Sequence, residues 1–196
     1  MQAATEAKAA IFSRYREMDN DTLIADTVAI ATCQRLFANS CAMCHGSDAR
    51  GARGFPNLTD DDWLYGGSFD TIMQTLNDGR AGAMPVMVAG LDESGISDLV
   101  VYVQSLSGQK ADQGMAARGK KSFDMLCVAC HGPDGTGNQA LGSPNLTDNT
   151  WLYGGDPATI RETLTQGRNG NMPAFKDLLS EDRRRLITAY VLSLSE

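Results

Sequence analysis

The sequence lacks any long apolar run. Across its 196 residues, no stretch approaches the roughly 20 apolar residues that a bilayer-spanning helix needs. Its start, Met1 followed by Gln, Ala, Ala, Thr and Glu, has neither the basic region nor the apolar region of an export signal. The sequence as it stands therefore predicts neither a membrane anchor nor a leader.

Positive charge is also scarce. There are 17 Lys and Arg residues against 24 Asp and Glu residues, which gives a formal net charge of −7. Because nucleic-acid phosphates are bound by Lys and Arg, this balance disfavours nucleic acid as a partner. Two interpretations of the acidic surface stay open: a merely solvated face, or a field that steers a basic partner.

Histidine is rare, and both copies occur in one pattern. The chain has two histidines and five cysteines, and an odd number of cysteines cannot all pair with each other. Four cysteines form two C-x-x-C pairs, each followed directly by histidine: Cys41-Ala-Met-Cys44-His45 and Cys127-Val-Ala-Cys130-His131. Cys33 is left over.

These motifs belong to a tandem repeat. Pro56-Asn-Leu-Thr, Trp63-Leu-Tyr-Gly-Gly and Met84-Pro recur in the same order, beginning at Pro144, Trp151 and Met172. The predicted organisation is a helical N-terminal extension over 1–27, a first repeat over 28–107, a linker over 108–113 and a second repeat over 114–196. Helix-forming residues from Ala3 to Met18 favour the helical extension.

Each repeat is predicted to be helical. The closing segment of the first repeat carries apolar residues at helical spacing, and the second repeat has an equivalent face: Ile96, Leu99, Val100 and Val103, then Leu186, Ile187, Tyr190, Val191 and Leu194. No stretch shows sustained strand alternation. The predicted fold class is all-α, with two small domains of about 80 residues, each too small for a robust core without a prosthetic group.

C-x-x-C-H is the attachment signature of c-type haem. In a helical turn the thiols at i and i+3 share a face, where each can form a thioether to a haem vinyl group, and the next residue, His45 or His131, is placed over the iron. A thioredoxin-like redox pair does not need the histidine, and a zinc site would have to unite both repeats. We therefore expect two covalently bound haems.

Methionine is the expected second axial ligand, because thioether sulfur suits an electron-transfer haem iron. Met84 aligns with Met172, and each precedes a proline, which favours an extended loop. Met73 and Met87 align instead with Arg161 and Phe175. Two strong axial ligands leave a substrate no open position, so the chain is not expected to be an enzyme by itself.

Further residues are candidates for the surroundings of the haems. The carbonyls of Pro56 and Pro144 are expected to accept a hydrogen bond from the ligating histidines. The propionates are expected to meet polar side chains, with plain packing or solvent exposure as the alternative: Trp63, Tyr65, Trp151, Tyr153, Arg80 and Arg168. Cys33 aligns with Gly119, where a small residue would let two helices cross closely near Tyr102 or Tyr190; a reactive thiol is the alternative.

Each repeat resembles a class I cytochrome c, with C-x-x-C-H in its first helix, a Pro-bearing loop, a Met-Pro loop and a terminal helix with an aromatic residue. The loop from His45 to Thr59 and the doubled Trp-Leu-Tyr-Gly-Gly look like those of the dihaem subunit of cbb3-type cytochrome c oxidases. This resemblance covers nearly the whole chain from about residue 10 and implies that each domain wraps its own haem.

The resemblance also implies a role and a location. Electrons would pass from a donor c-type cytochrome through the two haems to the monohaem subunit and the catalytic subunit of the oxidase. The expected place is the periplasmic side of the bacterial inner membrane, as the soluble part of a subunit whose anchor is absent here. Two alternatives are a free-standing periplasmic dihaem shuttle and a haem that loses its methionine and binds a gas or peroxide.

Overall fold

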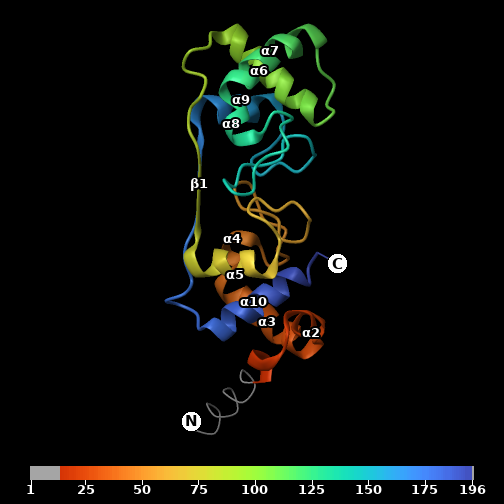
Figure 1. The fold of residues 1–196 in the computed structure, drawn as a ribbon, viewed down its shortest axis with the longest axis vertical. Coiled ribbons are helices and arrows are strands. Elements are labelled where there is room, and N and C mark those ends of the chain that lie inside the picture. The colour runs from red at the N-terminus through yellow and green to blue at the C-terminus, as the bar shows by residue number, and fades with distance from the viewer. Residues whose placement is uncertain (1–13, 196) are drawn as a thin grey trace. The chain divides into compact units, whose positions relative to one another are not determined.

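The computed structural model describes residues 14–195, and these form helices and two short strands (Figure 1). The elements are α2 (Asn20–Ala25), α3 (Thr27–Ser40), α4 (Ala42–His45), α5 (Phe69–Asp78), β1 (Arg80–Met84), α6 (Glu93–Leu106), α7 (Gln113–Leu126), α8 (Val128–His131), α9 (Pro157–Gln166), β2 (Arg168–Met172) and α10 (Glu181–Leu192). Among these residues no helix is long and apolar enough to cross a membrane.

The all-α prediction is wrong in one respect, because β1 and β2 pair as a two-stranded sheet. Each strand has only five residues, too few for an alternating pattern to stand out in the sequence. Residues 14–17 are helical, and residues 3–13 of the predicted helical extension lie outside the described part of the chain.

Side-chain caps set the starts of α3, α5, α7 and α9. Asp26 accepts hydrogen bonds from the first backbone N–H groups of α3, and Asp112 does the same for α7. Ser68 and Asp156 occupy equivalent places before α5 and α9. These local signals explain why both repeats have the same order of elements.

The helices assemble into two compact units that differ from the two sequence repeats. The first unit holds the described residues up to Asp61, then Gly67–Arg80 and the chain from Met172 onward. The second unit holds Asp62–Gly66 and Ala81–Asn171. The closing helix of each repeat, α6 or α10, is therefore part of the unit that contains the first helix of the other repeat.

In the second unit α6 packs along α7 and also contacts α9, as the neighbouring yellow-green and green helices show (Figure 1). Tyr102 of α6 meets Phe123 of α7 with ring centroids 5.2 Å apart. Edge-to-face aromatic pairs of this kind add to the free energy gained from burial. The buried core of this unit comprises Val88, Ile96, Leu99, Val100, Val103, Phe123, Cys127, Ile160 and Leu164.

In the first unit α10 packs on α3 and contacts α5 and α2 (Figure 1). Tyr190 of α10 meets Phe37 of α3 with ring centroids 5.3 Å apart. Phe37, Leu186 and Ile187 are almost completely buried. The apolar face predicted for the closing segment therefore does form a core, but with the first helix of the other repeat.

A close helix approach explains the small residue at position 119. A Cβ added to Gly119 would lie 2.0 Å from the carbonyl oxygen of Asp98 and 2.8 Å from Cβ of Tyr102. The equivalent Cys33 of α3 is fully buried, and burial raises the pKa of its thiol to about 12. The small-residue interpretation fits this structure, whereas a reactive thiol does not, because the nucleophilic form of cysteine is the thiolate.

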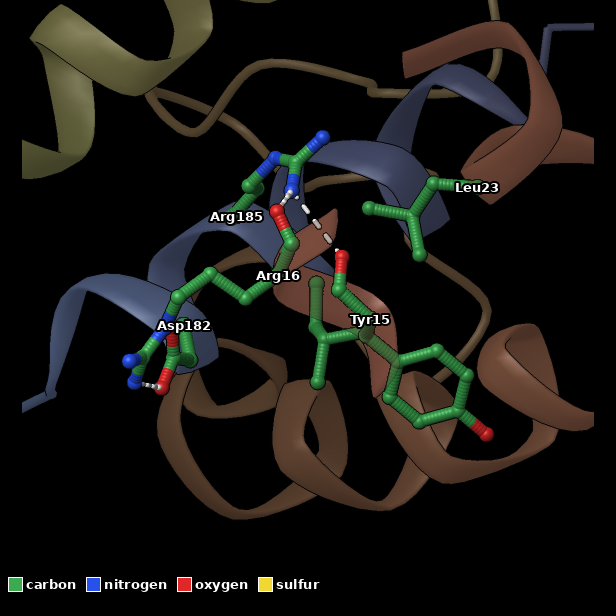
Figure 2. Close-up of a pocket in the computed structure, with 6 residues that line it drawn as sticks. Tyr15, Arg16, Leu23, Asp182 and Arg185 are labelled. Atoms are coloured by element: carbon green, nitrogen blue, oxygen red, sulfur yellow. Dashed lines mark hydrogen bonds and ion pairs between the residues drawn. The ribbon is translucent and has the colours of Figure 1, made fainter. Parts of the chain in front are cut away.

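Contacts with α10 also hold the segment before α2. Arg16 forms a bidentate ion pair with Asp182, with Nε–Oδ1 and Nη2–Oδ2 distances of 2.9 and 2.5 Å. Arg185 donates to the backbone carbonyls of Tyr15, Arg16 and Met18, in part as drawn in Figure 2. Arg16, Asp182 and Arg185 line the pocket drawn there together with apolar side chains. Their polar groups are bound to one another and to the backbone, so we interpret the pocket as part of the contact between the two segments.

We predict that Gly119→Ala lowers the free energy of unfolding by about 1–3 kcal/mol, because the new Cβ would overlap the α6 backbone. Gly114→Ala in the same helix is the matched control. A Cβ added to Gly114 would meet no backbone atom of α6, and its nearest contact would be Asp112 Oδ1 at 3.3 Å. Alanine there should change stability by less than about 1 kcal/mol. Denaturant unfolding measures both, and equal effects would contradict the close packing.

Candidate haem sites

The first C-x-x-C-H motif forms a single helical turn. Cys41 is the N-cap of α4, and its carbonyl accepts hydrogen bonds from the backbone N–H groups of Cys44 and His45 at 3.1 and 3.0 Å. Cys41 and His45 are buried, whereas Cys44 is exposed. The backbone turn therefore places the two cysteines three residues apart in one helical turn, with His45 directly after the second.

The second motif has the same geometry in α8. The Cys127 carbonyl accepts from the N–H groups of Cys130 and His131 at 3.1 and 2.9 Å. Burial raises the pKa of both inner thiols, Cys41 and Cys127, to about 11. A thioredoxin-like pair instead works through a thiol whose pKa is depressed, so this environment does not favour the redox-pair alternative.

Each histidine ring is oriented by a backbone carbonyl. His45 Nδ1 lies 3.0 Å from the carbonyl oxygen of Pro56, and His131 Nδ1 lies 3.2 Å from that of Pro144. Since a carbonyl only accepts, Nδ1 must carry the proton, and Nε2 is left with its lone pair free for a metal. Burial lowers the pKa of His131, which favours the neutral imidazole that a metal needs.

Glycine allows the loop after each histidine to turn back. The N–H of Gly51 donates to the His45 carbonyl at 2.8 Å, and Gly137 does the same for His131. Both glycines have positive φ, and a Cβ on Gly51 would lie 2.3 Å from the Phe55 carbonyl oxygen. This tight turn is what carries the proline carbonyl onto the ring.

The two predicted methionines are exchanged between the units. Met84, at the end of β1, packs against the core of the second unit, which contains Cys127. Met172, at the end of β2, belongs to the first unit together with Cys41–His45. The structure therefore differs from the expectation that each repeat wraps its own haem, because each unit combines a histidine from one repeat with a methionine from the other.

Sequence reasoning missed the two glycines that lie against the backbone carbonyls of these methionines. A Cβ on Gly167 would lie 2.4 Å from the Met84 carbonyl oxygen, and one on Gly79 would lie 2.4 Å from that of Met172. Both glycines have a φ of +72°. The Gly-Arg dipeptide that occurs in both repeats, Gly79-Arg80 and Gly167-Arg168, was the sequence feature that could have indicated these glycines.

The arginines after these glycines are held in place. Arg168 donates to Thr163 Oγ1 at 2.9 Å and pairs with Glu162 at 2.8 Å, and its guanidinium lies 4.5 Å from the centroid of the Tyr153 ring. Its Nη2 is buried and has no hydrogen-bond partner among the described residues. A buried guanidinium nitrogen of this kind fits a carboxylate, such as a haem propionate. Arg80 donates to Thr75 Oγ1 at 2.8 Å.

The aromatic candidates all lie in the second unit. Trp151 is partly buried against its core, and Tyr153 lies under Arg168. Trp63 and Tyr65, although they belong to the first repeat, are grouped there as well. A Cβ on Gly142 would come within 2.2 Å of the Tyr65 ring. The structure thus separates Trp63 and Tyr65 from the motif of their own repeat.

Comparison with known proteins agrees with the motif and the repeat. The family model for cytochrome C oxidase, cbb3-type, subunit III matches twice, over residues 28–103 and 114–191. The chain belongs to this family. It therefore consists of two tandem cytochrome c-type domains in sequence, and cytochromes c carry covalently bound haem.

Individual relatives point the same way. The chain is 43% identical to the CcoP subunit of Rubrivivax gelatinosus over 197 residues, which covers 100% of this chain and 64% of the relative. It is 43% identical to FixP of Azorhizobium caulinodans, covering 99% of this chain and 69% of the relative, and 46% identical to FixP of Bradyrhizobium diazoefficiens, covering 85% and 61%. The chain thus spans less than two thirds of the first of these proteins.

We predict that Gly51→Ala destabilises the first unit by about 1–3 kcal/mol, because alanine is strained at this φ and its Cβ would strike the Phe55 carbonyl. Moving that loop also weakens the His45–Pro56 hydrogen bond. Thermal unfolding and the NMR signal of the His45 ring N–H measure the two effects. Gly90→Ala, with no atom within 4 Å of its added Cβ, is the control and should change neither.

Proposed function

We propose that this chain binds two covalent haems and relays single electrons as a subunit of a cbb3-type oxidase. The observation that carries the proposal is the duplicated C-x-x-C-H turn, in which each histidine is oriented by a proline carbonyl. Family membership and the names of the relatives support the oxidase assignment.

The residues suit two covalently held haems. Cys41 and Cys44 would form thioethers to one haem, and Cys127 and Cys130 to the other. One cysteine of each pair is buried and the other is exposed. When bound, the haem iron supplies one-electron redox chemistry.

The axial residues set the behaviour of the iron. His45 and His131 would present Nε2 to it, while the proline carbonyls hold the ring orientation and increase the basicity of the ligand. Met84 and Met172 would supply sulfur, which raises the potential of an electron-transfer haem. With both axial positions filled, the chain offers no binding position to a substrate and is not an enzyme by itself.

Charged and polar side chains would hold the propionates. Arg168 is the strongest candidate because its buried Nη2 lacks a partner among the described residues. Tyr153 packs under that guanidinium, and Arg80 occupies the equivalent place in the first repeat. Trp63, Tyr65 and Trp151 are weaker candidates whose contacts are equally those of packing residues.

The proposed partners are those of an oxidase subunit. A donor c-type cytochrome would deliver electrons, and the monohaem and catalytic subunits would receive them, on the periplasmic side of the bacterial inner membrane. The net charge of −7 suits a donor with a basic docking face, because opposite charges speed encounter. The relatives are named as oxidase subunits, which favours this role over that of a free shuttle.

We predict two haems per chain in the matured protein, and one after Cys41→Ala/Cys44→Ala or Cys127→Ala/Cys130→Ala. Haem quantified against protein by a pyridine haemochrome assay measures this. The reduced spectrum should be unaffected by carbon monoxide, since both axial positions are filled. A spectral shift at one haem would show that a methionine ligand is absent or labile and would favour the gas-binding alternative.

A second prediction concerns the oxidase. A full-length form of this subunit, tagged and expressed in a host that makes a cbb3-type oxidase, should co-purify with the monohaem and catalytic subunits. In the double variant Cys127→Ala/Cys130→Ala, oxygen uptake from reduced donor cytochrome should fall, whether or not the subunit still assembles. Recovery of the wild-type subunit alone, with normal oxidase activity in its absence, would instead support the free shuttle.

A further inference from the structure

We propose that each haem receives its axial methionine from the other repeat. Met172 would ligate the iron of the haem on Cys41 and Cys44, and Met84 that of the haem on Cys127 and Cys130. This inference rests on the proposed His/Met coordination and adds the pairing of the ligands. It departs from the arrangement that the sequence order suggests, in which each repeat closes its own site.

The second unit places Met84 with the second motif. Apart from Asp62–Gly66, this unit is the continuous segment Ala81–Asn171, so Met84 and His131 belong to one compact body. Met84 packs against the buried core that includes Cys127, and Val88, four residues later, is itself part of that core. Gly167 of the same unit lies against the Met84 carbonyl.

The first unit places Met172 with the first motif. Gly79, which precedes β1, lies against the Met172 carbonyl. Just beyond it, the N–H of Phe175 donates to the Leu76 carbonyl of α5 at 2.8 Å, and Lys176 Nζ lies 3.7 Å from Asp78 Oδ1. The Met-Pro loop of the second repeat is therefore bound to the α5 region of the first repeat by backbone contacts as well as charge.

Side chains that differ between the repeats favour this exchange. Asp98 of α6 is 5% exposed and forms a bidentate ion pair with Arg118 of α7, with distances of 2.6 and 2.7 Å. The position of Arg118 in the first repeat is Thr32. If α6 packed on α3 of its own repeat, Asp98 would be buried opposite Thr32 and Cys33, without its guanidinium partner. A buried carboxylate that has lost its cation is strongly destabilising.

A second set of contacts gives the same preference. Arg161 of α9 pairs with Glu93 at 2.8 Å and donates to Ser97 Oγ at 2.6 Å, which ties α6 to the second unit. The aligned residue of the first repeat is Met73, which can do neither. Conversely, Arg185 and Asp182 of α10 hold residues 15, 16 and 18, and this extension has no counterpart in the second repeat.

The exchange makes both sites depend on the whole chain. A site closed by Met172 is incomplete until the last part of the chain has folded onto α3 and α5. A single isolated repeat would hold a haem on its two cysteines and histidine but would lack the packing partner of its closing helix. The two sites are therefore coupled through folding even though each lies in its own unit.

The test uses matured protein that carries one haem. With Cys41→Ala/Cys44→Ala, only the haem on Cys127 and Cys130 remains. In this background Met84→Ala should abolish the long-wavelength sulfur-to-iron band of the ferric haem and open the ferrous haem to carbon monoxide, whereas Met172→Ala should leave the band in place. In the reciprocal background, Cys127→Ala/Cys130→Ala, the two methionine variants should exchange effects.

Met87→Leu, close to Met84 in sequence and aligned with Phe175, is the matched control and should leave the band intact in both backgrounds. The intact dihaem protein gives an independent measurement that does not require a site to be emptied. In its reduced form, NMR cross-relaxation should connect the Met84 ε-methyl group, through one haem, to the β-protons of Cys127 and Cys130, and the Met172 methyl group to those of Cys41 and Cys44.

The outcomes separate the two proposals. The opposite assignment, Met84 with the first motif and Met172 with the second, would overturn the exchange and leave the His/Met electron-relay function standing. If no methionine variant lost the sulfur-to-iron band in either background, His/Met coordination itself would be overturned, and the exchange with it.

Discussion

The packing of each closing helix against the first helix of the other repeat is the interaction on which this structure depends. In the second unit α6 approaches α7 so closely that position 119 has no room for a side chain. In the first unit α10 packs on α3, where Phe37 and Tyr190 are in ring contact. Small domains of about 80 residues bury little apolar area, so this helix pair carries much of the core.

Each candidate haem site divides into a local half and a distant half. The histidine and the proline carbonyl lie 11 or 13 residues apart along the chain, and backbone hydrogen bonds together with a left-handed glycine bring them together. The methionine, in contrast, arrives on a strand that leads toward a closing helix. Its place is therefore decided by where that helix packs rather than by its own neighbours in sequence.

The two units use different chemistry for the same helix pairing. The second unit has a glycine at the crossing and a largely buried carboxylate held by Arg118. The first unit has a buried cysteine thiol there, and its closing helix is further held by the N-terminal segment through Arg16 and Arg185. Because these contacts are not interchangeable, each closing helix has a preferred partner, which a repeat with identical copies would lack.

The sequence by itself determined the repeat, the apolar faces of the closing helices, the C-x-x-C-H turns and the two aligned Met-Pro dipeptides, because each of these depends on the order and spacing of residues along the chain. It also pointed to the carbonyls of Pro56 and Pro144, which the structure places beside Nδ1 of each histidine. Only the tertiary structure decided that Met84 lies with the second motif and Met172 with the first. Two similar repeats present two similar docking faces to every closing helix, so periodicity cannot choose between them. The choice depends on individual contacts such as that of Asp98 with Arg118, which exist only once the helices are packed.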